Sequence, residues 1–180
     1  MDPDARLRLY QPGLDAPPPD FRGRPRWLYG DIHPVIAMVA EDVRVEISDL
    51  VWQPPDACEV WPAREVALAM EVGYDRVELQ RRFAAGFLGV AMQRCPIGER
   101  HGIRVATTGV FAFDCPPDRY RIGSLLGAEW SPDGTVLRDQ AVRIVQEADR
   151  AIGRVAKTER EPRATVQVWI CSRVMAPIVG

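Results

Sequence analysis

The chain has 180 residues, 47% of them hydrophobic, and a formal net charge of −2. This length fits one domain with a sizeable core, and the near-balanced charge argues against a nucleic-acid partner, which needs a basic patch. The amino-terminal residues are charged and no uncharged stretch approaches the ~20 residues that cross a bilayer, which argues against a secretion signal and a membrane partner. We expect a cytoplasmic protein, and the use of arginine for every cation but Lys157 indicates a GC-rich bacterial genome.

The cysteines stand far apart, without a CxxC pair, and we expect buried, reduced thiols: Cys58, Cys95, Cys115 and Cys171. A zinc site would have to use Cys95, His101 and Cys115, whose spacing C-x5-H-x13-C matches no zinc pattern. The sequence also lacks a glycine-rich phosphate loop and a GxSxG elbow. We therefore expect no metal and no cofactor.

Residues 1–26 form a distinct amino-terminal region, because six of the chain's 16 prolines fall there. Such a segment favours extended conformations and does not build a core. It nevertheless carries apolar residues that a solvated linker would not need: Leu7, Leu9, Tyr10, Leu14 and Phe21. We expect an extended arm that lies over its own domain or a neighbour, followed by a single α+β domain over residues 27–180.

The first half of that domain is expected to contain two strands and then two helices. His33–Ala40 is an apolar run typical of a buried strand, and Asp42–Ser48 alternates with period two, which indicates a strand with one wet face. Ala63–Val72 is rich in helix formers behind Pro62. Asp75 is a suitable cap for a second helix that runs to about Arg94.

The second half is expected to contain a hairpin, a long helix and a last strand. Ile103–Phe113 and Arg119–Trp130 are the predicted hairpin strands, with Cys115–Asp118 as the turn between them. In Thr135–Thr158 the apolar residues recur at three- and four-residue steps, which predicts an amphipathic helix. Ala164–Val174 alternates through Val166, Val168 and Ile170 and predicts the last strand.

This β-α-β-β-α-β order predicts an α+β two-layer sandwich with both helices on one face of a mostly antiparallel sheet. The ferredoxin-like and the chorismate-mutase-like or YjgF-like arrangements both fit it. The other sheet face would then expose large apolar residues, for which we considered Trp52, Trp169, Met38 and Phe113. Because such residues are poorly placed in water, we expect a homo-oligomer, a dimer or a trimer.

Two groups of residues could carry acid/base or nucleophilic chemistry. In an extended segment Asp31 and His33 point to the same side, so the carboxylate can orient the imidazole as a general base. In the structural alternative, Asp31 caps a turn and His33 closes the first strand, without a catalytic role. Cys95 lies close to Glu99 and His101 in sequence, but at the end of a predicted helix, where the negative dipole raises a thiol pKa and favours a structural cysteine.

Residues 66–83 contain a local resemblance to the second helix-turn-helix of arabinose-type bacterial transcription activators. It is carried by Val66–Tyr74, Leu79 and Arg82-Phe83, and it implies duplex DNA binding. The spacing from Gly73 to Leu79 is one residue shorter than in that family, and the paired first helix-turn-helix is missing. A one-residue slip rotates a helical position by ~100°, so we do not assign the chain to that family.

The leading hypothesis is a homo-oligomer that binds a small molecule in a pocket at a sheet edge or subunit interface. It would act as an acid/base enzyme through Asp31 and His33, with His101 as a further catalytic candidate, and would hold an anionic group with Arg104, Arg119 or Arg121. The alternative is a non-catalytic regulatory or assembly protein that binds a protein partner through its arm and sheet face. A DNA-binding regulator is the weakest hypothesis because of the charge balance.

Overall fold

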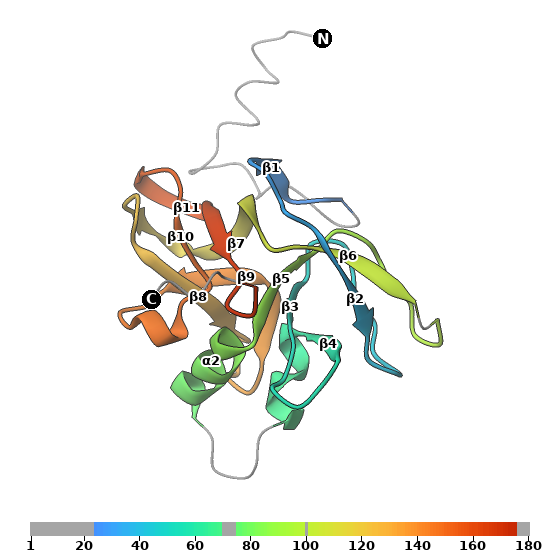
Figure 1. Cartoon of the computed structure of the whole chain (residues 1–180). Coiled ribbons are helices and arrows are strands. Elements are labelled where there is room, and N and C mark those ends of the chain that lie inside the picture. The colour runs from blue at the N-terminus through green and yellow to red at the C-terminus, as the bar shows by residue number, and fades with distance from the viewer. Residues whose placement is uncertain (1–23, 70–74, 100, 176–180) are drawn as a thin grey trace, which may run out of the picture.

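The computed structural model describes residues 24–69, 75–99 and 101–175, and strands dominate this part of the chain. Two five-stranded barrels lie side by side, with the helical segments below them in the view of Figure 1. The expected α+β sandwich, whether ferredoxin-like or chorismate-mutase-like or YjgF-like, is therefore wrong. Residues 1–23 of the predicted arm lie outside the described residues, whereas Arg26 at its end is buried in the folded body.

The first barrel contains strands from the first 106 residues, in the order β2-β4-β3-β5-β6. Its strands are β2 (Val35–Val39), β3 (Leu50–Trp52), β4 (Glu59–Pro62), β5 (Phe87–Ala91) and β6 (Gly102–Ala106). The antiparallel pairing of β2 with β6 closes the ring. Small and branched side chains fill its interior, among them Val39, Val45, Val51, Val60, Ile103 and Val105. The barrel interior is therefore a packed core rather than a channel.

The second barrel follows directly in sequence. Its elements are β7 (Thr108–Tyr120), β8 (Leu125–Trp130), β9 (Leu137–Ile144), η2 (Ala148–Arg150), β10 (Gly153–Val155) and β11 (Glu159–Cys171). The strands pair in the order β7-β11-β10-β8-β9, and a parallel contact between Asp114 of β7 and Ala141 of β9 closes the ring. A further strand, β1 (Trp27–Tyr29), pairs with β7 and so brings the start of the chain to this barrel.

The predicted helices of the first half are confirmed only in part, and residues 70–72 of the first one lie outside the described residues. Residues Ala63–Ala69 form the 3-10 helix η1, and α2 spans only Arg76–Ala85. Asp75 caps α2 as predicted, because its side chain accepts a hydrogen bond from the backbone N of Glu78 at 2.8 Å. The expected continuation to Arg94 is wrong because Phe87–Ala91 is buried along its whole length as β5, between β3 and β6. A side chain at Gly89 would place Cβ 1.8 Å from the carbonyl O of Ala106, so only glycine fits there.

The expected helix Thr135–Thr158 is also wrong, since this segment forms β9, η2 and β10. Its apolar residues fit both periods, and in the structure Leu137 and Ala141 of β9 are buried, as is Val145 directly after it. The deciding contact is at Gly153, where a Cβ would lie 2.4 Å from the carbonyl O of Trp169. The close approach of β10 to β11 therefore depends on a glycine that would weaken a helix interior by about 1 kcal/mol.

The remaining strand predictions succeed in part. His33–Ala40 contains β2 and Ala164–Val174 overlaps β11, as expected, but Asp42–Ser48 is no strand and keeps only one isolated bridge, between Val45 and Cys95. The predicted turn at Cys115–Asp118 lies inside β7. A register shift opposite Arg163 and Thr165 of β11 marks a bulge at this point, which lets two prolines sit in the strand.

Candidate interaction face around Trp169

One row of side chains crosses five neighbouring strands on the outer wall of the second barrel. Tyr29 of β1 pairs with Val110 of β7, Val110 pairs with Trp169 of β11, Trp169 pairs with Arg154 of β10, and Arg154 pairs with Leu125 of β8. Residues paired in regular register project from the same side of a sheet. The register of β1 shifts between Trp27 and Tyr29, and Tyr29 is placed on this side because it lines a surface hollow together with Val110 and Trp169. We call this row the Trp169 face: Tyr29, Val110, Trp169, Arg154 and Leu125.

Strand alternation fixes the outward direction of the row. Val168 and Ile170 flank Trp169 in β11 and are fully buried inside the barrel, so the residue between them points outward. The indole of Trp169 is 59% exposed and the ring of Tyr29 is 51% exposed. The indole Nε1 donates a hydrogen bond to Thr108 Oγ1 at 3.2 Å, which restrains the ring while its faces stay open to water.

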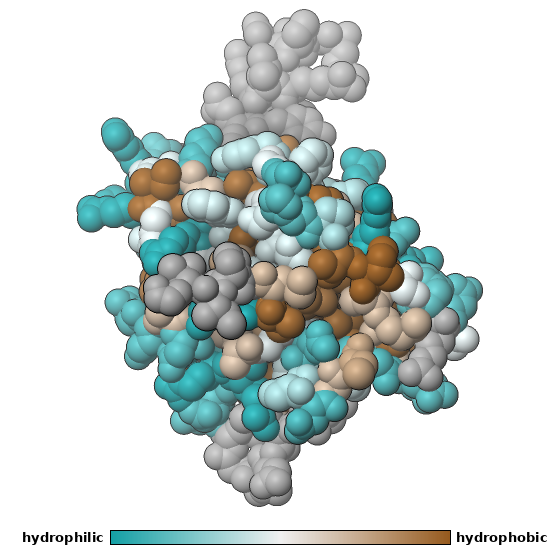
Figure 2. Space-filling view, in the orientation of Figure 1, coloured by the Kyte–Doolittle hydropathy of each residue, from teal (hydrophilic) through white to brown (hydrophobic). Residues whose placement is uncertain are grey.

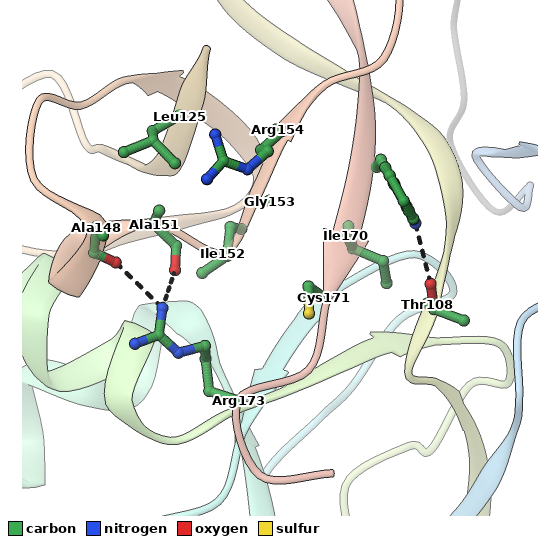
Figure 3. Close-up of a pocket in the computed structure, with 11 residues that line it drawn as sticks. Thr108, Leu125, Ala148, Ala151, Ile152, Gly153, Arg154, Ile170, Cys171 and Arg173 are labelled. Atoms are coloured by element: carbon green, nitrogen blue, oxygen red, sulfur yellow. Dashed lines mark hydrogen bonds between the residues drawn. The ribbon is translucent and has the colours of Figure 1, made fainter. Parts of the chain in front are cut away.

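Two hollows flank the ridge that Trp169 and Arg154 form. The larger, about 570 Å³, is lined by residues that include Tyr29, Asp31, His33, Val110 and Ile122. The smaller, about 330 Å³, includes Leu125, Ile152, Gly153, Cys171 and Arg173 (Figure 3). Thr108, Arg154 and Trp169 line both hollows. Each volume lies in the range that accepts a group larger than one side chain.

The two hollows differ in charge. Arg154 and Arg173 are the charged residues of the smaller hollow, and Figure 3 shows them on opposite sides of Ile152 and Gly153. Arg173 Nη1 donates to the carbonyl O atoms of Ala148 and Ala151 at 3.1 and 3.4 Å. The larger hollow adds Asp31 and His33 to Arg154. The face is therefore basic at the β10 end and carries a carboxylate at the β1 end.

The structure brings the predicted pair Asp31 and His33 together at the larger hollow. His33 Nε2 lies 3.6 Å from Asp31 Oδ2, and the backbone N of His33 donates to Asp31 Oδ1 at 3.2 Å. Their side chains are 74% and 70% exposed. His101 lies apart from them, beside β6 of the first barrel, with Nε2 3.8 Å from Glu99 Oε2. The three predicted catalytic residues therefore do not form one constellation.

The three arginines proposed for an anionic ligand are also dispersed. Arg104 lies on β6 opposite Ile36, Arg119 lies near the end of β7, and Arg121 follows that strand. Neither hollow includes any of them among the residues that the structure describes. Cys95 is buried inside the first barrel, with its Sγ 3.0 Å from the carbonyl O of Glu99, and it does not end a helix as expected.

Sequence reasoning missed the association of Trp169 with Arg154 and Tyr29. Of the four residues expected on an exposed sheet face, Trp169 and Met38 are exposed, whereas Trp52 and Phe113 are buried in the core. Figure 2 shows apolar side chains gathered across the middle of one face, including the region over β2. Arg154 lies in the segment for which the sequence predicts a helix. A local sequence pattern does not indicate which residues pair across neighbouring strands.

A second group of polar residues lies buried at the junction of the barrels. Asp49 accepts a hydrogen bond from Gln140 Nε2 at 2.9 Å, and Gln140 Oε1 accepts one from Arg26 Nε at 2.8 Å. Burial, together with the nearby carboxylate of Asp139, raises the pKa of Asp49 to about 7. Because Asp49 precedes β3 of the first barrel and Gln140 belongs to β9 of the second, these hydrogen bonds connect the two barrels.

Neither a metal site nor a membrane-spanning helix is found among the described residues. They contain no group of three or more His, Cys, Asp or Glu side chains able to hold a metal ion. Among the same residues, no helix has both the length and the apolar character that crossing a membrane requires.

Comparisons with known proteins identify no family. No family model and no curated protein matches the chain. Among solved structures, the head fiber gp8.5 N base in bacteriophage phi29 is similar, with a TM-score of 0.41 and 14% sequence identity over 78% of this chain and 95% of that one. A similarity at this level carries no argument about function.

Proposed function

We propose that the chain is a non-catalytic assembly protein whose copies associate through the Trp169 face. The observation that carries the proposal is the exposed indole of Trp169, which stands on a barrel wall between two hollows. Trp, Tyr and Arg are the residues that most often dominate the binding energy of protein interfaces. Three residues of these types, Trp169, Tyr29 and Arg154, lie in one cross-strand row here.

A second copy of the chain is the occupant that this face suits. The Trp169 face carries both the protruding indole and the hollows that an indole can fill, so the surface is complementary to itself. It also carries both signs of charge, with Asp31 toward the β1 end and Arg154 toward the β10 end. A patch with these two properties can pair with itself without burying an unpaired charge.

The test is the effect of Trp169→Ser on the oligomeric state of the full chain, measured by sedimentation velocity over a range of concentrations. We expect the wild-type protein to form an oligomer and the variant to be a monomer. Ile36→Ser is the matched control, because Ile36 is 71% exposed on the first barrel, and it should leave the oligomer unchanged. A wild-type monomer at high concentration, or a Trp169→Ser variant that associates normally, overturns the proposal.

The same experiment separates assembly from small-molecule binding. If the wild-type chain is monomeric, and if small aromatic carboxylates raise its melting temperature in a way that depends on Arg154, the hollows are ligand sites. That outcome would favour the small-molecule hypothesis over assembly, with Asp31 and His33 at the edge of the site.

A further inference from the structure

We infer that two copies pair about a two-fold axis that passes between Val110 and Trp169 of the Trp169 face. This inference rests on the proposed self-association and adds its geometry and its stoichiometry, a dimer. In such a pair each indole enters the larger hollow of the other copy, and each Arg154 meets the other copy's Tyr29 and Asp31.

The order of residues in the row leads to this arrangement. Neighbouring strands lie ~4.8 Å apart, so Val110, Trp169, Arg154 and Leu125 form a line of nearly even spacing, and Tyr29 extends it at the β1 end, where the register shifts. A two-fold axis across the row reverses its order in the partner. With the axis between the second and third positions, Trp169 lies over the partner's Val110, and Arg154 lies over the partner's Tyr29.

The contacts that result are favourable in shape. Val110 is 93% buried within its own chain at the larger hollow, and the apolar surface that this hollow offers to an indole includes the side chain of Ile122, which is 62% exposed. The two Trp169 rings would lie next to each other across the axis, at the offset separation that aromatic pairs prefer. The hollow of about 570 Å³ has room for one indole and the edge of a second side chain.

The contacts are also favourable in charge. Arg154 uses Nη1 to donate to the carbonyl O of Gly123 at 2.8 Å, which aims the guanidinium and leaves its other N–H groups for a partner. Asp31 is 74% exposed, and its carboxylate lies 3.6 Å from the imidazole of the similarly exposed His33. A guanidinium above Tyr29 gains a cation–π contact, and the neighbouring carboxylate of Asp31 adds an ion pair.

Charge reversal tests the pairing. Asp31→Arg alone and Arg154→Glu alone each place like charges at both symmetry-related contacts, and each should raise the dimer dissociation constant by about tenfold or more. The double variant Asp31→Arg/Arg154→Glu should return it to near the wild-type value, which also shows that the reversed side chains do not prevent folding. Sedimentation velocity gives the dissociation constants.

Mixing the two single variants tests the symmetry. In a two-fold pair each variant supplies what the other needs, so an equimolar mixture should form a 1:1 heterodimer more readily than either variant forms a homodimer. Wild-type association that survives both single reversals unchanged would overturn this inference while leaving the proposed function intact. A trimer or an open series of larger species would overturn it as well. A wild-type monomer would instead overturn the proposed function itself.

Discussion

Arg64 and Asp139 join the two barrels through a two-point contact. The backbone N of Arg64 donates to Asp139 Oδ1 at 2.9 Å, and Nη1 of the same arginine donates to Oδ2 at 2.8 Å. Arg64 belongs to η1, which directly follows β4 of the first barrel, and Asp139 belongs to β9 of the second. Because both carboxylate oxygens are held by one residue, this contact fixes the orientation of one barrel against the other.

Removing the Asp139 carboxylate should destabilise the whole protein. Asp139→Ala leaves the partly buried guanidinium of Arg64 with the carbonyl O of Arg44 and the more distant carboxylates of Asp49 and Glu65, at 3.6 and 3.7 Å. We expect a loss of about 2 kcal/mol or more in the free energy of unfolding, measured by urea denaturation. Asp149→Ala is the control, since its ion pair with Arg81 is exposed and should contribute much less to stability. Equal losses in the two variants would contradict a specific role for the junction.

The stability of the protein should fall as pH rises from about 4 to about 7. Burial raises the pKa of Asp49 from 3.8 to about 7, so the folded state holds this proton more tightly than the unfolded state. The stabilisation is fully present below the unfolded value and is lost as pH passes through the folded value. At ~1.4 kcal/mol per unit, the raised pKa corresponds to about 4 kcal/mol as an upper bound.

Asp49→Asn identifies the source of that pH dependence. Because the amide does not titrate, the fall in unfolding free energy across this window should be strongly reduced in the variant, whatever its absolute stability. Urea denaturation of both proteins at several pH values between 4 and 8 measures the two slopes. An unchanged slope in the variant would assign the effect to another group.

Two of the four thiols should react with a thiol reagent in the folded protein, and the other two should be protected. Cys58 and Cys171 are exposed, whereas Cys95 and Cys115 are buried, and burial raises the pKa of Cys115 to about 11. Because the thiolate is the nucleophile, a thiol reagent at neutral pH should modify two cysteines in the native monomer and all four after unfolding. Cys171 lies two residues from Trp169 on the same outward side of β11, so its modification should slow as the protein associates while that of Cys58 does not. Rapid native modification of Cys115 would contradict its placement in the core.

Gly153→Ala should be among the most damaging substitutions of a single small residue. The added Cβ would lie 2.4 Å from the carbonyl O of Trp169, and backbone atoms there cannot yield without separating β10 from β11. We expect a loss of about 3 kcal/mol or more, by overpacking and the disruption of the strand pair. Gly98→Ala adds a Cβ with nothing within 4 Å at a φ of +88°, so it should cost only the strain of that backbone, about 1–2 kcal/mol. Thermal and urea denaturation of both variants compare the cost of the steric contact at Gly153 with the cost of the backbone strain at Gly98. Similar losses of unfolding free energy would show that β10 can move to relieve the contact.

The sequence predicted local events well where one short segment decided them. The cap at Asp75 and the strand at β2 depend on neighbours within a few residues, and both are present. It failed for Phe87–Ala91 and for Thr135–Thr158 because their apolar residues fit a helix and a strand about equally well. There the choice depends on segments distant in sequence, such as Ala106 opposite Gly89 and Trp169 opposite Gly153.

The same division applies to the candidate site. The sequence by itself paired Asp31 with His33, and it marked Trp169 as a residue poorly suited to water. The expected reason for the pair, an extended segment, is wrong, because His33 has a φ of +38° and its backbone N donates to Asp31 Oδ1. The net charge of −2 also argued against a basic patch that would bind nucleic acid. Only the tertiary structure decided that Tyr29, Arg154 and Trp169 lie in one row. The physical reason is that strand register is set by packing inside the barrel, where Val168 and Ile170 are buried, and so the outward row follows from the inward one.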